Sequence, residues 1–218
     1  MNEMTRRAVL TASGVAAFAA AGLADATDRT PRWRTIPPRD AIRTRHFPDV
    51  VLHTHENREV RLYEDLIKDK FVTINFMYTN CEGTCPTTTH NLARVQKLLK
   101  DRVGRDLFMY SITLDPEHDT PQALARYARR HGVGPGWVFL RAEPADTPLL
   151  RRKLGFYDAD PAVDADRSTH TAMLRYGNEP RQLWSATSAL VAPGAIAKAI
   201  LYVDWPGRKT AQVLGCCN

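Results

Sequence analysis

Two cysteines separated by three residues are the residues of this sequence best suited to chemistry. Cys81 and Cys85 stand in the segment Asn80–Pro86, directly after the apolar run 71–79. Thiolates are both nucleophiles and metal ligands, so the pair could form a stabilising disulfide, act as a redox couple, or hold a metal ion. The spacing alone leaves all three uses open.

The neighbouring sequence places this pair where a strand leads into a helix. The run 71–79, FVTINFMYT, has the length and composition of a strand buried on both faces, and a helical pattern follows Pro86. Free backbone N–H groups at a helix start favour thiolate over thiol. Gly83 permits a tight turn, so both sulfurs could share one ion. Two soft thiolates suit Cu(I), and one imidazole would complete a three-coordinate site.

A third ligand would have to come from one of the seven histidines. His170 is the best placed, because it follows a predicted loop and opens a predicted strand. His53 and His55 alternate on a strand and would point to one face, which is also typical of surface histidines. His90 lies in the helix after the cysteines and His118 in a turn. For each of them, a hydrogen-bonded structural histidine is the alternative.

The order of the predicted elements indicates an α/β protein. The patterns predict a β-hairpin at 50–63, strands at 71–79, 106–115 and 137–142, helices at 87–104, 120–132 and 146–156, a loop at 158–168, a second hairpin at 169–187 and a helix at 192–204. This alternation predicts a thioredoxin-like fold: a central mixed β-sheet flanked by helices, plus an N-terminal β-hairpin.

The N-terminal residues are typical of an export signal. Residues 1–26 carry paired arginines, Arg6 and Arg7, then an alanine-rich stretch and a small-x-small cleavage pattern, which favours the twin-arginine route. An uncleaved membrane anchor is the alternative. Residues 27–49 hold four prolines among arginines and predict an extended arm, which leaves 50–218 as the folded domain. Export would place the protein in the periplasm or on the outer face of the cytoplasmic membrane.

Composition excludes few partners. The chain has 218 residues, 44% of them hydrophobic, and a net charge of +6 that is scattered along it. The run Arg151–Lys153 is typical of a solvated helix face. Neither zinc-finger spacing nor a phosphate-binding glycine loop is present, so nucleic acid is not an expected partner.

Four motifs together resemble the Sco/SenC family of copper chaperones. They are FMYTNCEGTCP, SITLDPEHDTP, GPGWVFL and STHTAMLRYG, in this order, and the resemblance runs from about Val50 to Val203. It implies a thioredoxin-like domain that binds one copper ion, Cu(I) or Cu(II), through Cys81, Cys85 and His170. The implied role is to deliver copper to, or maintain the thiols of, the copper site of cytochrome c oxidase. The implied partners are a copper-receiving oxidase subunit and a copper donor or thiol reductant.

The sequence departs from the family pattern at a few positions. Glu82 and Gly83 follow the first cysteine, where many members have a proline soon after it. Thr169 precedes the histidine, where Asp is common, so the supporting carboxylate is either missing or supplied by Asp164 or Asp166. Most members are tethered to a membrane, whereas membrane contact is expected here only if the N-terminal segment stays uncleaved.

Two functions fit these residues. One is a metallochaperone, which breaks no substrate bond. The other is a thiol–disulfide oxidoreductase in which Cys81 attacks a partner disulfide and Cys85 resolves it, with His170 as a base or a bystander. A domain with a permanent disulfide is the structural alternative. Cys216 and Cys217 near the C-terminus could relay copper, pair with another chain, form a vicinal bridge, or be idle.

Overall fold

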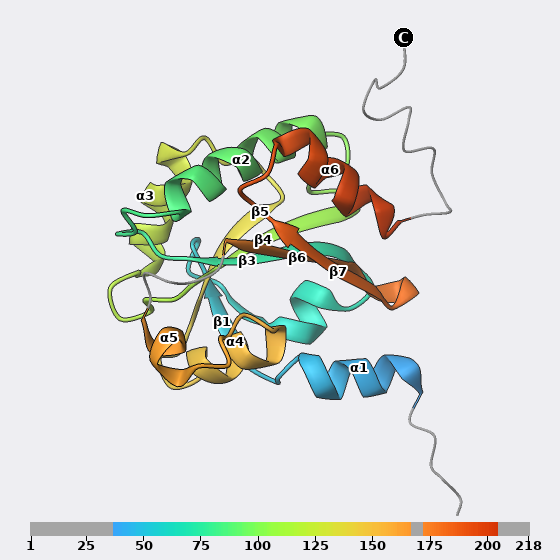
Figure 1. Cartoon of the computed structure of the whole chain (residues 1–218), viewed down its shortest axis with the longest axis horizontal. Coiled ribbons are helices and arrows are strands. Elements are labelled where there is room, and N and C mark those ends of the chain that lie inside the picture. The colour runs from blue at the N-terminus through green and yellow to red at the C-terminus, as the bar shows by residue number, and fades with distance from the viewer. Residues whose placement is uncertain (1–36, 167–171, 205–218) are drawn as a thin grey trace, which may run out of the picture. The chain divides into compact units, whose positions relative to one another are not determined.

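A mixed seven-stranded sheet forms the centre of the computed structural model, which describes residues 37–166 and 172–204 (Figure 1). The order across the sheet is β2-β1-β5-β4-β3-β6-β7. The strands are β1 (Val51–Thr54), β2 (Glu59–Arg61), β3 (Phe71–Met77), β4 (Leu107–Thr113), β5 (Trp137–Ala142), β6 (Met173–Asn178) and β7 (Leu183–Ser188). This architecture confirms the predicted fold class.

The three central strands run parallel, and both flanks of the sheet are antiparallel hairpins. β3 pairs in parallel with β4, and β4 with β5. The predicted N-terminal hairpin, β1 and β2, joins the sheet through antiparallel pairing of β1 with β5. The second predicted hairpin, β6 and β7, joins through antiparallel pairing of β6 with β3. The cysteine-bearing chain therefore leaves the sheet from an interior strand.

Helices cover the sheet on both sides (Figure 1). They are α1 (Pro38–His46), the π-helix η1 (Leu62–Ile67), α2 (Cys85–Leu98), α3 (Pro121–Arg130), α4 (Thr147–Leu154), α5 (Pro161–Ala165), the 3-10 turn η3 (Glu179–Arg181) and α6 (Pro193–Tyr202). One core cluster lies between the sheet and α2, α3 and α6. The other lies between the sheet and α1, η1 and α4.

Strand β3 is buried along its whole length because it contributes to both clusters. Val72, Ile74 and Phe76 alternate along the strand and pack with the α1, η1 and α4 cluster. Phe71 and Met77 point the other way, into the cluster beneath α2. This two-sided burial explains the continuous apolar run and fixes the direction in which β3 presents the following cysteine loop.

The prediction of an extended arm over residues 27–49 is wrong where the structure describes it, because Pro38–His46 form helix α1. Pro38 occupies the first turn of the helix, where a backbone N–H would have no partner within the helix and its loss costs nothing. Arg39 anchors the helix to the carboxylate of Glu179 with two hydrogen bonds of 2.7 Å. Residues 1–26, with the predicted export signal, and 27–36 lie outside the described residues, so these domain boundaries stay predictions.

Two further segments test local sequence rules. Helix α3 begins as predicted: Pro121 is in the first turn and the Thr120 hydroxyl accepts a hydrogen bond from the Ala123 N–H at 3.2 Å. The expected loop at 158–168 contains a short helix, α5, which the Asp160 carboxylate caps by accepting from the Ala162 N–H at 2.9 Å. Among the described residues, none of the helices has the length and apolarity to cross a bilayer.

Candidate metal and thiol site

The predicted cysteine pair lies at the junction between β3 and α2. Cys81 belongs to the loop after β3, and Cys85 is the first residue of α2, with Pro86 in its first turn. Neither cysteine is in a disulfide; the Cys81 residue is 8% exposed and the Cys85 residue 1%. The loop and the helix start, rather than two turns of one helix, bring the sulfurs together.

The two sulfurs differ in their acid–base character. Burial raises the pKa of the Cys81 thiol, but hydrogen bonds to its sulfur outweigh burial and lower the pKa below its ordinary value. The donors are the Cys85 thiol, the backbone N–H groups of Cys85 and Gly83, and the Tyr78 hydroxyl. Burial raises the pKa of Cys85, and its hydrogen bond to Cys81 raises it further. The first charge on the pair therefore resides on Cys81.

Tyr78 closes one side of this thiol pair. Burial raises the pKa of its hydroxyl to about 12, and its hydrogen bond to Cys81 and the negative charge of the cysteines act in the same direction. The hydroxyl therefore stays protonated and can donate to the Cys81 sulfur at neutral pH. This role could not be predicted from the sequence, because Tyr78 lies near the end of an apolar run typical of a strand.

The buried carboxylate of Asp119 anchors the start of the cysteine loop. Asp119 accepts a hydrogen bond from the Thr79 N–H at 3.0 Å and others from the hydroxyls of Thr79 and Thr113. The Asp119 residue is only 2% exposed, and within the described ranges no lysine or arginine forms an ion pair with it. The position of Asp119 in the DPEHDTP motif, 38 residues after Cys81, is the one signal in the sequence that points to this residue. The motif does not indicate which groups the carboxylate binds.

The structure separates the predicted histidines. His170 lies outside the described residues. His53 sits on β1, 3.7 Å from a Glu143 oxygen, and the His55 ring accepts from the Phe139 N–H at 3.1 Å. β5 and β4 lie between β1 and β3, so neither histidine belongs to the cysteine site. His90 is exposed on α2.

His118 takes part in a separate group. The Nδ1 atom of His118 lies 3.0 Å from a carboxylate oxygen of Asp115. With Glu117, these side chains place ligand atoms within 4.8 Å of one another, the one such trio of potential metal ligands in the part of the chain described. The sequence predicts a turn at His118, but not that this turn brings two carboxylates to the histidine.

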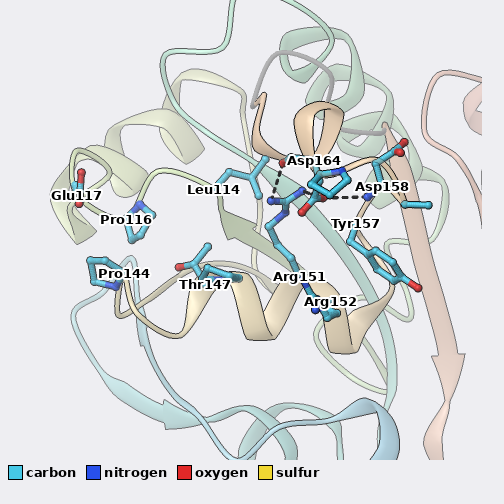
Figure 2. A pocket seen from close by; sticks show the side chains of 13 residues that line it. Leu114, Pro116, Glu117, Pro144, Thr147, Arg151, Arg152, Tyr157, Asp158 and Asp164 are labelled. Atoms are coloured by element: carbon cyan, nitrogen blue, oxygen red, sulfur yellow. Dashed lines mark hydrogen bonds and ion pairs between the residues drawn. The ribbon is translucent and has the colours of Figure 1, made fainter.

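A cavity of about 640 Å³ lies between this turn and helices α4 and α5 (Figure 2). On its wall, Arg151 donates to a carboxylate oxygen of Asp164 at 2.6 Å, and the Asp158 N–H donates to the same oxygen at 2.9 Å. Asp164 is therefore occupied in joining α4 to α5. Asp166 is the better of the two predicted supporting carboxylates, since its charge contributes to the raised pKa of Tyr78.

A mixed sheet whose interior strand presents two cysteines at the start of a helix defines a thioredoxin-like protein. The chain belongs to the SCO1/SenC family, whose model matches residues 49–177. A SCO1 protein homolog of Bacillus subtilis is 33% identical over 75 residues, which is 34% of this chain and 38% of that protein's own length.

Two solved structures show the same fold. Arabidopsis thaliana ScoI with copper bound has a TM-score of 0.59 and 18% identity, covering 73% of this chain and 98% of that one. BsSco, described as having a disulfide switch and belonging to the Sco family of cytochrome c oxidase assembly proteins, has a TM-score of 0.59 and 20% identity, covering 72% and 92%. At these identities the likeness establishes the fold.

Proposed function

We propose that this chain is an exported copper chaperone that carries one copper ion to the copper site of a respiratory oxidase such as cytochrome c oxidase, or maintains the thiols of that site. Copper is its cargo, held by Cys81, Cys85 and His170. One observation carries the proposal: two buried cysteines that form no disulfide share a hydrogen bond at the β3–α2 junction of a SCO1/SenC family member.

The donor set fits copper. Two thiol sulfurs form a soft site, which Cu(I) prefers over harder oxygen ligands. Cys81 is biased toward thiolate by the donors around it, whereas Cys85 keeps its proton in the metal-free protein. Binding would release that proton, so affinity should increase with pH. The burial of both sulfurs would shield the cargo from water and oxidants.

Strand register supports His170 as the third ligand. β6 runs antiparallel to β3, with Phe71 opposite Asn178 and Ile74 opposite Arg175. The N-terminal end of β6, at Met173, is therefore at the end of the sheet where β3 leads into the cysteine loop. His170 precedes Met173 by three residues in sequence.

Export is part of the same proposal. The paired arginines and alanine-rich stretch of residues 1–26 support it, with residues 50–218 as the copper-binding domain. In an oxidising compartment the two thiols would need a reductant before they could accept Cu(I), so a thiol reductant and a copper donor are proposed partners. The copper-receiving oxidase subunit is the third.

Copper titration of the reduced full chain against a competing Cu(I) chelator tests the ligand set. We expect one ion per chain, loss of tight binding in Cys81→Ser and Cys85→Ser, and at least about tenfold weaker binding in His170→Ala. His90→Ala is the matched control, because it removes an exposed histidine from α2. Binding that His170→Ala leaves unchanged would remove that histidine from the site.

The difference in acidity between the two thiols favours a second function, thiol–disulfide exchange. Cys81, the more exposed cysteine with the lowered pKa, would attack a partner disulfide, and Cys85 would then attack the mixed disulfide to release the reduced partner. Each such reaction leaves a Cys81–Cys85 disulfide, which a thiol reductant must reduce again. Turnover of a model disulfide by the metal-free protein with excess thiol reductant, unaffected by His170→Ala, would support this function over the chaperone role.

A further inference from the structure

A second cavity, far along the chain from the cysteines, has a different chemistry. It has a volume of about 240 Å³ and lies among α1, the end of α4 and the β6–β7 hairpin. Its apolar walls come from Ile42, Phe47 and Leu154. Its polar groups come from α1, the two strands and the turn between them. The cavity therefore offers both apolar surface and polar groups to a ligand, whereas a packing defect in the core is lined by apolar atoms.

Arg175 brings a positive charge to this cavity without a carboxylate partner. In the described part of the chain none of the acidic side chains forms an ion pair with it, and its guanidinium donates to the Leu154 carbonyl. Burial lowers the pKa of Arg175, which shows that its charge is poorly compensated. An unpaired cation held in a partly buried place is costly unless an anion joins it.

The backbone makes room for this arginine. Gly155, after α4, has a φ of +78°, and a Cβ there would lie 2.6 Å from the Arg175 guanidinium. Glycine is the residue that accepts this conformation without strain. The absence of a side chain at Gly155 therefore leaves space that the Arg175 guanidinium occupies at the end of α4.

Two more polar atoms at the cavity are buried without a hydrogen-bond partner among the described residues: the indole N–H of Trp184 and the side-chain oxygen of Gln182. The Gln182 amide nitrogen donates to the Glu179 backbone carbonyl and, at 3.1 Å, to its carboxylate, so the side-chain oxygen is the free end. The Trp184 ring lies directly over Gly177, where a Cβ would approach it to 2.1 Å.

The surrounding charges leave the cavity positive. His46 also lines it, and burial, followed by the charge of Arg175, lowers the pKa of that histidine. Glu179 lies behind Gln182, but Arg39 pairs with its carboxylate at 2.7 Å and the Tyr63 hydroxyl donates to it at 2.8 Å. The carboxylate charge of Glu179 is thus already neutralised.

We propose that this cavity is a binding site for a small organic carboxylate. The carboxylate would pair with Arg175 and accept from the Trp184 indole, and the apolar body would contact Ile42, Phe47 and Leu154. A hydroxyl on the ligand would satisfy the Gln182 oxygen. An inorganic anion would leave the apolar walls unused, and a neutral apolar molecule would leave the arginine unpaired. The cavity volume is below the range of drug-sized pockets, so it restricts the ligand to a small molecule such as a simple aromatic acid.

Nuclear magnetic resonance on the full chain can test this with benzoate as the probe. The indole N–H signal of Trp184, identified by its absence in Trp184→Phe, should shift saturably on titration. Benzyl alcohol and inorganic phosphate should each bind at least about tenfold more weakly than benzoate, because each lacks one of the two complementary features. Equal binding of either compound would overturn the proposal, as would the absence of a saturable shift with benzoate.

Substitution of the arginine completes the test. Arg175→Gln should weaken benzoate binding at least about tenfold. Arg175→Lys keeps the charge and should retain weaker but measurable binding, so it serves if the glutamine variant does not fold. Arg152→Gln, an exposed arginine on α4, is the matched control and should bind as the wild type does. Unchanged affinity in both Arg175 variants would contradict the assignment.

Discussion

Two buried carboxylates lie at opposite ends of β3 and are stabilised in different ways. Asp119 supports the loop that leaves the C-terminal end of the strand, and neutral donors surround it: one N–H and two hydroxyls. Glu179 follows β6 at the other end, where Phe71 pairs with Asn178, and it has Arg39 as a cationic partner. One end of the strand therefore keeps an unneutralised negative charge, and the other does not.

The difference between the two carboxylates matches the parts of the molecule that they hold in place at the two ends of β3. Asp119 lies near the thiols, and its charge contributes, after burial and Cys81, to the raised pKa of Cys85. A cation paired with Asp119 would favour the thiolate form of Cys85 and so oppose that increase in pKa. Glu179 lies far from the thiols and joins α1 to the domain, so an arginine from α1 itself is a suitable partner. Neutral donors thus fix the cysteine loop without supplying positive charge to it.

The largest effect is expected at Asp119. Asp119→Ala should lower the free energy of unfolding by about 3 kcal/mol, because it leaves three donors of the cysteine loop and β4 without an acceptor. Asp119→Asn keeps one acceptor oxygen and should cost about 2 kcal/mol. Urea denaturation of the reduced protein measures both. Asp101→Ala, an exposed aspartate, is the control. A loss at Asp119→Ala no greater than in this control would show that the carboxylate does not anchor the loop.

The sequence predicted the sheet, most helices and the cysteine junction because those depend on short-range periodicity. It did not predict what Asp119 and Glu179 do, because each acts through partners distant in sequence: Thr79 lies 40 positions from Asp119, and Arg39 lies 140 from Glu179. Helix α1 was missed for the same reason. The arginine-rich segment lacks a strong apolar stripe, and the contacts that hold it, among them the ion pair of Arg39 with Glu179, are with residues distant in sequence.

A smaller and pH-dependent effect is expected at Glu179. Burial alone would raise its pKa, but Arg39, the Asp69 N–H and the Tyr63 hydroxyl together lower the pKa below its ordinary value. A lowered folded-state pKa stabilises the fold above the unfolded-state pKa, near 4.3, and that stability is lost as pH falls through the folded-state value.

Glu179→Gln should therefore lower the free energy of unfolding at pH 7 by about 2 kcal/mol, a modest figure because the Arg39 side chain is 41% exposed and partly screened. The gap between variant and wild type should narrow below about pH 4 as the wild-type carboxyl takes up a proton. Denaturation curves at several pH values measure it. A gap that is constant with pH would mean that shape, not charge, is what the variant removes.

The smallest effects are expected when one neutral donor is removed from each carboxylate. Thr113→Val removes a hydroxyl from Asp119, which has no cationic partner within the described ranges, and should cost about 1.5 kcal/mol. Tyr63→Phe removes a hydroxyl from Glu179, which keeps Arg39, and should cost about 0.7 kcal/mol.

Adding Arg39→Gln to Tyr63→Phe should raise the cost of losing the hydroxyl toward the value expected for Thr113→Val, because the two donors then no longer share the carboxylate charge. Equal costs for the two single variants would mean that a cation at one end of β3 makes no difference to how firmly its carboxylate is held.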